Sequence, residues 1–180
     1  YAKILRPPAH GATLKKADTT AAEKIAGVRV VRDGDFVAVL AKDPDLAGKA
    51  LSQIQAQFDT PEVPVDDKTI FDHLLKTAPR GEAAAQGGDL STGEKESAFT
   101  IGKTYLNSYV SHAPIEPHTA TARMEGGRIT VWASTQSPFG AKGQIAQTLG
   151  LPENAVRVIT PFVGGGFGGK NNNQQAVEAA

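Results

Sequence analysis

The stretch Val156-Arg-Val-Ile-Thr-Pro-Phe-Val-Gly-Gly-Gly-Phe-Gly-Gly-Lys170 carries the strongest structural signal in the chain. Its β-branched start predicts a strand over Val156–Phe162, and a helix is expected from about Asn172. The loop between them, Gly164–Lys170, contains five glycines, which permit positive φ and close approach of backbone N–H groups to a ligand. Because a helix start adds partial positive charge, this loop suits an anion such as phosphate or pyrophosphate.

Two other interpretations of the same loop are open at this point. It fits a flexible turn between core elements. It also fits a nucleotide-binding P-loop, because Gly164, Gly169 and Lys170 match the G-x-x-x-x-G-K spacing after a strand. Against the P-loop, Asn171 stands where Ser or Thr would place a hydroxyl on magnesium.

Residues 99–180, which surround the loop, predict a mixed α/β domain. The expected elements are a strand at Phe99–Tyr109, a hairpin of Thr119–Met124 with Arg128–Ser134, and a helix from Pro138 or Phe139 to Leu149. Gly150 is suited to cap the end of this helix. Trp132, the single tryptophan, is expected in the core.

The first 60 residues predict a compact α+β unit. The expected elements are a strand at Tyr1–Arg6, a short helix capped by Asp18 or Thr19, a hairpin of Val28–Arg32 with Phe36–Ala41, and a helix capped by Asp43. Residues 61–98 read as a linker with one helical turn at Ile70–Leu75. Arg80–Ser97 has almost no large apolar residue, so we expect it to be extended and exposed.

Composition excludes several classes of function. Lys and Arg total 19, as do Asp and Glu, so no net charge recruits nucleic acid. The chain has no cysteine and therefore cannot by itself hold a disulfide, a thiolate zinc site or an Fe–S cluster. No apolar run approaches the roughly 20 residues of a membrane span.

Several segments together resemble the large, molybdopterin-binding subunit of the xanthine oxidase/aldehyde oxidase family of molybdenum hydroxylases. They are the Gly164–Lys170 loop, Glu116-Pro117, Trp132-Ala-Ser-Thr-Gln-Ser-Pro138, Leu149-Gly-Leu-Pro152 and Val156-Arg-Val158. They occur in the family order, which favours this interpretation over the P-loop. Residues 1–60 resemble the family's small α/β hammerhead domain, and the Arg32–Ala41 hairpin is similar to bacterial isoquinoline 1-oxidoreductase and aldehyde dehydrogenase relatives.

This resemblance implies a molybdopterin cofactor and hydroxylation of aldehydes or N-heterocycles with water-derived oxygen. It implies that Gln136 hydrogen-bonds an oxo ligand of molybdenum, a role that suits a neutral amide donor. The remaining cofactor-binding candidates are Gly165, Gly166, Phe167, Gly168 and Gly169. No direct metal ligand is expected, because Pro114 and Pro117 interrupt the helical spacing of His112, Glu116 and His118 and a further ligand is not evident.

The domain prediction is a hammerhead-like domain at 1–60, its N-terminal part missing, a linker at 61–98, and the truncated start of a molybdopterin-binding domain at 99–180. The family's general base, a glutamate, is expected beyond residue 180, so this fragment should hold no catalytic residue and only the parent protein is expected to be an enzyme.

The resemblance also implies an Fe–S partner subunit and a bacterial protein of the cytoplasm or periplasm. Asn171 stands where xanthine-oxidising members place a glutamate, which argues against a purine substrate. Glu116 is expected to brace a turn beside Pro117.

Overall fold

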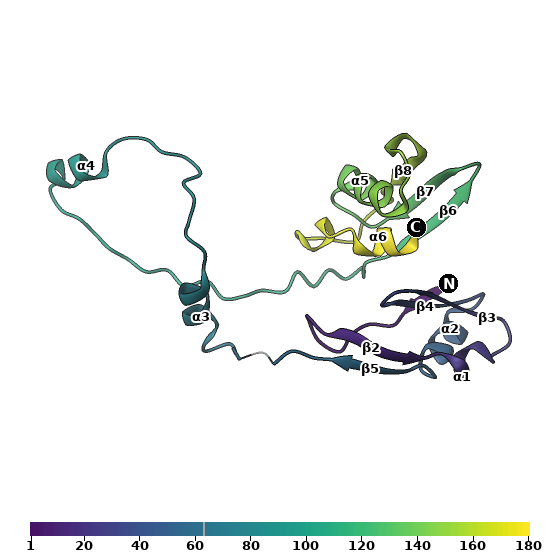
Figure 1. Ribbon diagram of the computed structural model, residues 1–180. Helices are drawn as coiled ribbons and strands as arrows, with labels where there is room; N and C mark the ends of the chain where they lie inside the picture. Colours follow the sequence, from purple (N-terminus) through teal and green to yellow (C-terminus); the bar gives the residue numbers. More distant parts are fainter. Residues whose placement is uncertain (63) are drawn as a thin grey trace. The chain divides into compact units, whose positions relative to one another are not determined.

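The computed structural model describes residues 1–62 and 64–180 (Figure 1). Position 63, within the predicted linker, lies outside the described residues. The chain divides into two compact units, residues 1–101 and 102–180, and each is described by itself. Helices and strands are mixed in both units, which confirms the α+β fold class. Among the described residues, no helix has the length and apolar character needed to cross a membrane.

Unit 1 contains one three-stranded sheet of order β1-β4-β3 and one two-stranded sheet of β2 with β5. All pairings within them are antiparallel. Its elements are β1 (Ala2–Ile4), β2 (Thr13–Asp18), α1 (Thr20–Glu23), β3 (Val28–Asp33), β4 (Phe36–Ala41), α2 (Pro44–Leu51), β5 (Gln55–Asp59), α3 (Ile70–Thr77) and α4 (Leu90–Glu96).

The predicted β3–β4 hairpin and the start of α2 are confirmed. Asp33 pairs with Phe36 across the turn, where Gly34 has a φ of 56°. The side chain of Asp43 accepts the N–H groups of Asp45 and Leu46 at 2.8 Å each. The core of this unit is formed by buried residues of α1, β4, α2 and the residue before β5, namely Ala22, Val37, Val39, Ala50 and Ile54.

The sheet of β2 with β5 has no counterpart in the sequence analysis. Its strands are mostly polar, and only Leu14 and Ala17 of β2 and Ala56 and Phe58 of β5 are partly buried. The two strands pair from Thr13 with Asp59 to Asp18 with Gln55, with an irregularity between Leu14 and Lys16. Because the two strands are far apart in the sequence, no local sequence pattern predicts that they pair.

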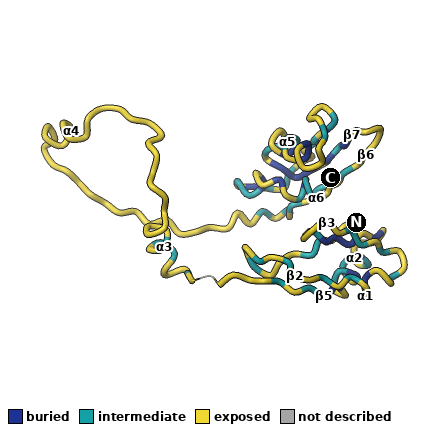
Figure 2. Tube along the Cα trace, in the orientation of Figure 1, coloured by how far each residue is buried: buried dark blue, intermediate teal, exposed yellow. Residues whose placement is uncertain are grey.

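The predicted linker is exposed but is not extended throughout. Residues 74–113 are exposed without interruption, as Figure 2 shows. The helical turn predicted at Ile70–Leu75 is confirmed as α3. Leu90–Glu96, however, forms α4, because the side chain of Asp89 accepts the N–H groups of Ser91 and Thr92 at its start. The strand predicted at Phe99–Tyr109 is wrong, since those residues adopt no regular structure.

Unit 2 contains a three-stranded sheet of order β6-β7-β8, with β6 antiparallel and β8 parallel to the central strand. The predicted hairpin and the predicted helix up to Leu149 are confirmed, and Gly150 caps that helix with a φ of 64°. The elements are β6 (Ala120–Glu125), β7 (Arg128–Ala133), α5 (Pro138–Leu149), the 3-10 turn η1 (Glu153–Ala155), β8 (Val156–Ile159), the 3-10 turn η2 (Gly169–Asn171) and α6 (Gln174–Ala179).

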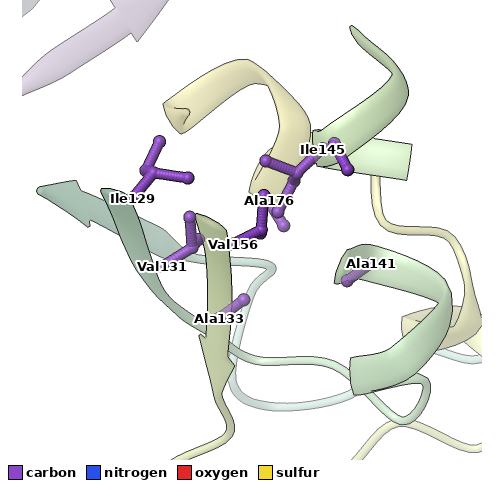
Figure 3. Close-up of a cluster of buried hydrophobic side chains, with 8 residues drawn as sticks. Ile129, Val131, Ala133, Ala141, Ile145, Val156 and Ala176 are labelled. Atoms are coloured by element: carbon purple, nitrogen blue, oxygen red, sulfur yellow. The ribbon is translucent and has the colours of Figure 1, made fainter. Parts of the chain in front are cut away.

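Helices α5 and α6 cover one face of this sheet. Figure 3 shows the buried side chains of β7 and β8 pointing toward those of the two helices. The cluster comprises Ile129, Val131, Ala133, Ala141, Ile145, Ala146, Val156 and Ala176. Alternation along β7 buries its odd-numbered residues, so Trp132 points to the other face and is 37% exposed. The prediction that it belongs to the core is wrong.

Candidate functional site: the glycine loop and its supports

The glycine loop, Gly164–Lys170, follows β8 and leads into η2 and α6, so the predicted strand, loop and helix order is confirmed. The strand ends at Ile159, earlier than predicted. Gly165 and Gly168 have φ values of 92° and 99°, which side chains rarely tolerate. Phe167 lies between them with a φ of 54° and is 74% exposed. The loop therefore presents an aromatic side chain on a strained backbone.

Gln136 supports the middle of the loop from the turn that follows β7. Its side-chain oxygen accepts the N–H of Gly168 at 3.0 Å. Because a backbone N–H can only donate, the amide oxygen must face Gly168, and the amide nitrogen is left as a donor. Among the described residues that nitrogen has no acceptor. Gln136 therefore combines a fixed orientation with an available N–H group.

The backbone around Gln136 is tied to the end of the loop. Its N–H donates to the carbonyl of Lys170 at 2.9 Å. The neighbouring hydroxyl of Thr135 is buried, donates to Asn173 Oδ1 at 2.7 Å and accepts the N–H of Ser137 at 2.9 Å. These contacts fix the position of Gln136 relative to η2 and the start of α6.

The side chain of Gln136 occupies the space that a side chain at position 166 would need. A Cβ built on Gly166 would lie 2.4 Å from Gln136 Oε1 and 2.7 Å from its Cδ. Gly166 is buried, and within the part of the chain that the structure describes its N–H has no acceptor. The N–H groups of Gly165 and Phe167 are likewise without an acceptor there. Three consecutive backbone N–H groups and the Gln136 amide nitrogen therefore have no hydrogen-bond acceptor within the described residues.

The segment His112–His118 supports the loop from another side. His118 Nε2 lies 3.1 Å from the carbonyl of Gly169, and a Cβ on Gly169 would lie 3.1 Å from the Cβ of His112. An open pocket of about 600 Å³ lies between this segment and residues 168–175. Ala113, with a φ of 35°, and Phe167 are the two non-glycine residues of positive φ in the described chain. Both strained residues therefore belong to this site, where strain is often concentrated.

Glu116 reaches both ends of the glycine loop. Its Oε2 accepts the N–H of Gly164 at 2.9 Å and an ion-paired hydrogen bond from Lys170 Nζ. Its own N–H donates to the Gly164 carbonyl at 3.3 Å. The hydrogen bonds from Lys170 and Gly164 lower the pKa of the Glu116 carboxyl. The sequence predicted only that Glu116 braces a turn beside Pro117. Its contacts with Gly164 and Lys170 of the glycine loop were not predicted.

The environment of Lys170 argues against the P-loop interpretation. A P-loop lysine must reach the phosphates of the nucleotide. The side chain of Lys170 is 0% exposed and points instead to Glu116. In the described residues no group of three or more His, Asp or Glu side chains is placed to hold a metal ion. The site therefore offers hydrogen-bond donors to a ligand rather than a cation for phosphate or a metal cage.

The candidate residues from the sequence are brought together in this unit. Gln136 contacts Gly166 and Gly168 directly, Phe167 contacts Gly165, and Gly169 lies beside the histidines. The sequence reasoning missed Glu116 and Lys170 as partners, and it missed Thr135. The available signals were the lysine at the end of the glycine loop and a glutamate in a proline-rich segment. The two residues are 54 positions apart, so the sequence did not indicate that they form a pair.

The chain is similar in sequence to the molybdenum-binding subunits of known enzymes. The aldehyde oxidoreductase molybdenum-binding subunit PaoC of Escherichia coli O157:H7 is 30% identical over 161 residues, which cover 87% of this chain and 21% of that protein. The nicotinate dehydrogenase large molybdopterin subunit of Eubacterium barkeri is 33% identical over 157 residues, covering 79% of this chain and 35% of that subunit. The chain thus spans between a fifth and about a third of the length of these relatives.

Solved structures show the same fold. Quinoline 2-oxidoreductase from Pseudomonas putida 86 superposes with a TM-score of 0.66 at 21% sequence identity, over 94% of this chain and 27% of that one. Among families of known domains, residues 74–180 match the family described as the molybdopterin cofactor-binding domain. This match covers more than half of the chain and includes every residue of the site described above. The chain belongs to the molybdopterin cofactor-binding domain family of the molybdenum hydroxylases.

Proposed function

We propose that this chain contributes the glycine-loop side of a molybdopterin site in a molybdenum hydroxylase that oxidises aldehydes or N-heterocycles. The observation that carries the proposal is a set of donors without an acceptor among the described residues, namely the Gln136 amide nitrogen and the N–H groups of Gly165, Gly166 and Phe167. When bound, molybdopterin supplies the redox-active molybdenum for hydroxylation with water-derived oxygen. The chain's own residues position and orient that group.

The donor set fits a cofactor that carries oxo groups. A neutral amide donates a hydrogen bond to an oxo group without adding a charge that would change its redox properties. Gln136 meets this requirement because its oxygen is already held by Gly168. The glycines provide space, since a Cβ on Gly166 would collide with Gln136. Gly168 and Gly169 would complete the cofactor-facing loop, and the exposed Phe167 would lie on the substrate side.

The remaining parts of the reaction are assigned to other segments or subunits. The general base is proposed to lie beyond residue 180, in agreement with the short span of this chain on its relatives. Since the chain has no cysteine, electrons would leave through Fe–S clusters held elsewhere, on a partner subunit. Residues 1–60 are proposed to form a hammerhead-like domain before the cofactor domain, and 61–98 to connect the two.

Asn171 bears on the choice of substrate. It is exposed, and its N–H donates to the carbonyl of Gly168 at 3.2 Å, so it lies at the end of the loop. A neutral residue here favours an aldehyde or a neutral N-heterocycle over a purine that needs a carboxylate partner. Turnover of benzaldehyde and of isoquinoline is expected to exceed turnover of hypoxanthine. Replacing Asn171 by Glu is expected to narrow that difference.

The direct test is the molybdenum content of the full-length gene product, purified with its Fe–S partner. Near-stoichiometric molybdenum that falls when Gln136 is replaced by Ala is the expected result. Molybdenum absent from well-folded, properly matured protein would overturn the proposal. Magnesium-dependent binding of ATP, lost on replacing Lys170 by Ala, would instead restore the P-loop interpretation, although the burial of Lys170 argues against it.

A further inference from the structure

The glycine loop is closed by a single carboxylate oxygen. Glu116 Oε2 contacts the N–H of Gly164 at the first position of the loop and the ammonium of Lys170 at the last. The Glu116 backbone adds a second contact to Gly164 through its N–H. Gly164 lies so close to this segment that a Cβ on it would be 2.7 Å from the Cβ of Glu116. One side chain therefore sets the distance between the two ends of the loop.

Lys170 connects this carboxylate to Gln136. Its side chain pairs with Glu116, while its carbonyl accepts the backbone N–H of Gln136 at 2.9 Å. Gln136 in turn holds the middle of the loop through Gly168. A continuous chain of contacts thus runs from Glu116 through Lys170 to the amide that we assign to the cofactor. A shift at Glu116 is therefore expected to reach Gln136 through Lys170, whose side chain is buried.

The two partners differ in their access to water. The Lys170 side chain is 0% exposed, whereas that of Glu116 is 31% exposed. Removing the carboxylate would leave a fully buried ammonium without a counter-ion, which is strongly unfavourable. Removing the ammonium would leave a carboxylate that water can still reach. The consequences of the two substitutions should therefore be unequal.

We propose that Glu116 and Lys170 are positioning residues that hold the glycine loop and the Gln136 amide in the geometry needed to retain molybdopterin. This inference rests on the proposed function. The pair contacts no reacting atom in this assignment, so it is not catalytic. Its contribution is to keep the loop donors at fixed spacing while cancelling the charge of a lysine next to the cofactor.

The test compares Glu116→Gln, Lys170→Met and the double variant in the full-length protein purified with its partner. Glutamine keeps an oxygen for the Gly164 N–H, and methionine keeps the length and the buried surface of lysine. The control is Glu125→Gln, which removes the carboxylate of the exposed Arg123–Glu125 pair in the same unit. Three quantities are measured for each protein: the midpoint of thermal unfolding, the molybdenum content and the rate of molybdenum release.

Glu116→Gln is expected to lower the unfolding midpoint more than Lys170→Met. The double variant should recover the midpoint, because no buried charge is left unpaired. It should nevertheless release molybdenum about tenfold faster than the unaltered protein, as expected when a supporting contact behind a cofactor ligand is lost. Glu125→Gln should match the unaltered protein in all three quantities.

A double variant that recovers both its unfolding midpoint and its molybdenum retention would overturn the inference, since the pair would then be purely structural. Equal midpoints for the two single variants would also contradict it. Failure of the proposed function has a different signature: the unaltered protein itself would contain no molybdenum. The two outcomes are therefore separable within one set of samples.

Discussion

The side-chain oxygen of Gln136 accepts the backbone N–H of Gly168 across 32 positions of sequence, at 3.0 Å. This contact joins the turn after β7 to the loop after β8. It resolves the orientation of the amide, because the oxygen is committed to the backbone and the nitrogen is left as a donor.

Replacing Gln136 by Glu is expected to preserve the fold and impair the site. One carboxylate oxygen can still accept the Gly168 N–H, but the donor is lost and a negative charge takes its place. Molybdenum retention or kcat should fall by about tenfold or more, the scale expected for a lost contact to a metal centre. Elemental analysis and steady-state kinetics on the full-length protein measure this. Gln147→Glu on the exposed side of α5 is the matched control; an equal fall there would show that the effect is only one of added charge.

Replacing Gly166 by Ala is expected to displace the Gln136 side chain. The new Cβ would lie 2.4 Å from Gln136 Oε1, but a glutamine side chain can rotate away. The free energy of unfolding should therefore fall by only about 1 kcal/mol, the value of one hydrogen bond, while molybdenum retention falls as in Gln136→Ala. Gly143→Ala in α5 is the control, since its nearest neighbour would be 3.9 Å away. That change should raise the free energy of unfolding by about 0.5 to 1 kcal/mol.

Stability should depend on the ionisation of Glu116 in acid. Its pKa in the folded state is lowered from 4.5 by the hydrogen bonds from Lys170 and Gly164. The carboxylate therefore stabilises the fold fully above pH 4.5, and this contribution is lost as the pH falls through the lowered pKa. The difference in unfolding midpoint between the unaltered protein and Glu116→Gln should be constant near neutral pH and shrink below pH 4.5. A difference that grows toward low pH would contradict the assigned ion pair.

Two similar aspartate caps are expected to differ in their effect on stability. Asp43 and Asp89 each accept two backbone N–H groups at the start of a helix. Helix α2 buries Ala47 and Ala50, whereas α4 buries no residue. Asp43→Ala should lower the free energy of unfolding of unit 1 by about 1 kcal/mol. Asp89→Ala should leave the cooperative transition unchanged and accelerate hydrogen exchange only within α4; a shared loss of stability would show that α4 is packed in solution.

Local patterns were sufficient to predict the elements that carry their own signals. The β3–β4 hairpin has a glycine turn, α2 has Asp43 before Pro44, and α5 ends at Gly150. The sheet of β2 with β5 was not predicted, because its strands are polar and pair with residues far away in the sequence. The strand predicted at Phe99–Tyr109 has the right composition but finds no pairing partner within the described chain. Strand propensity without a partner does not form a sheet.

The sequence predicted the cofactor-binding residues of the candidate site better than it predicted the residues that hold them in place. Gln136 and the glycines were identified through a family resemblance, and the structure brings them into contact. Their roles toward the cofactor stay predictions. Glu116 was assigned to a turn because its contacts with Gly164 and Lys170 are long-range. The burial of Lys170 could not be predicted either. A lysine that follows a run of glycines favours phosphate binding, which requires an accessible side chain.

The close packing of the glycine loop restricts which positions can vary when such a site acquires a new substrate. A side chain at 164 or 166 would collide with Glu116 or Gln136, and one at 169 would press on His112. Phe167 and Asn171 are exposed, so they can change without disturbing those supports. At 167 the positive φ adds a preference for Asn, Asp or Gly among replacements. Directed evolution of substrate range should therefore randomise positions 167 and 171 and leave Gly164, Gly166 and Gly169 unchanged.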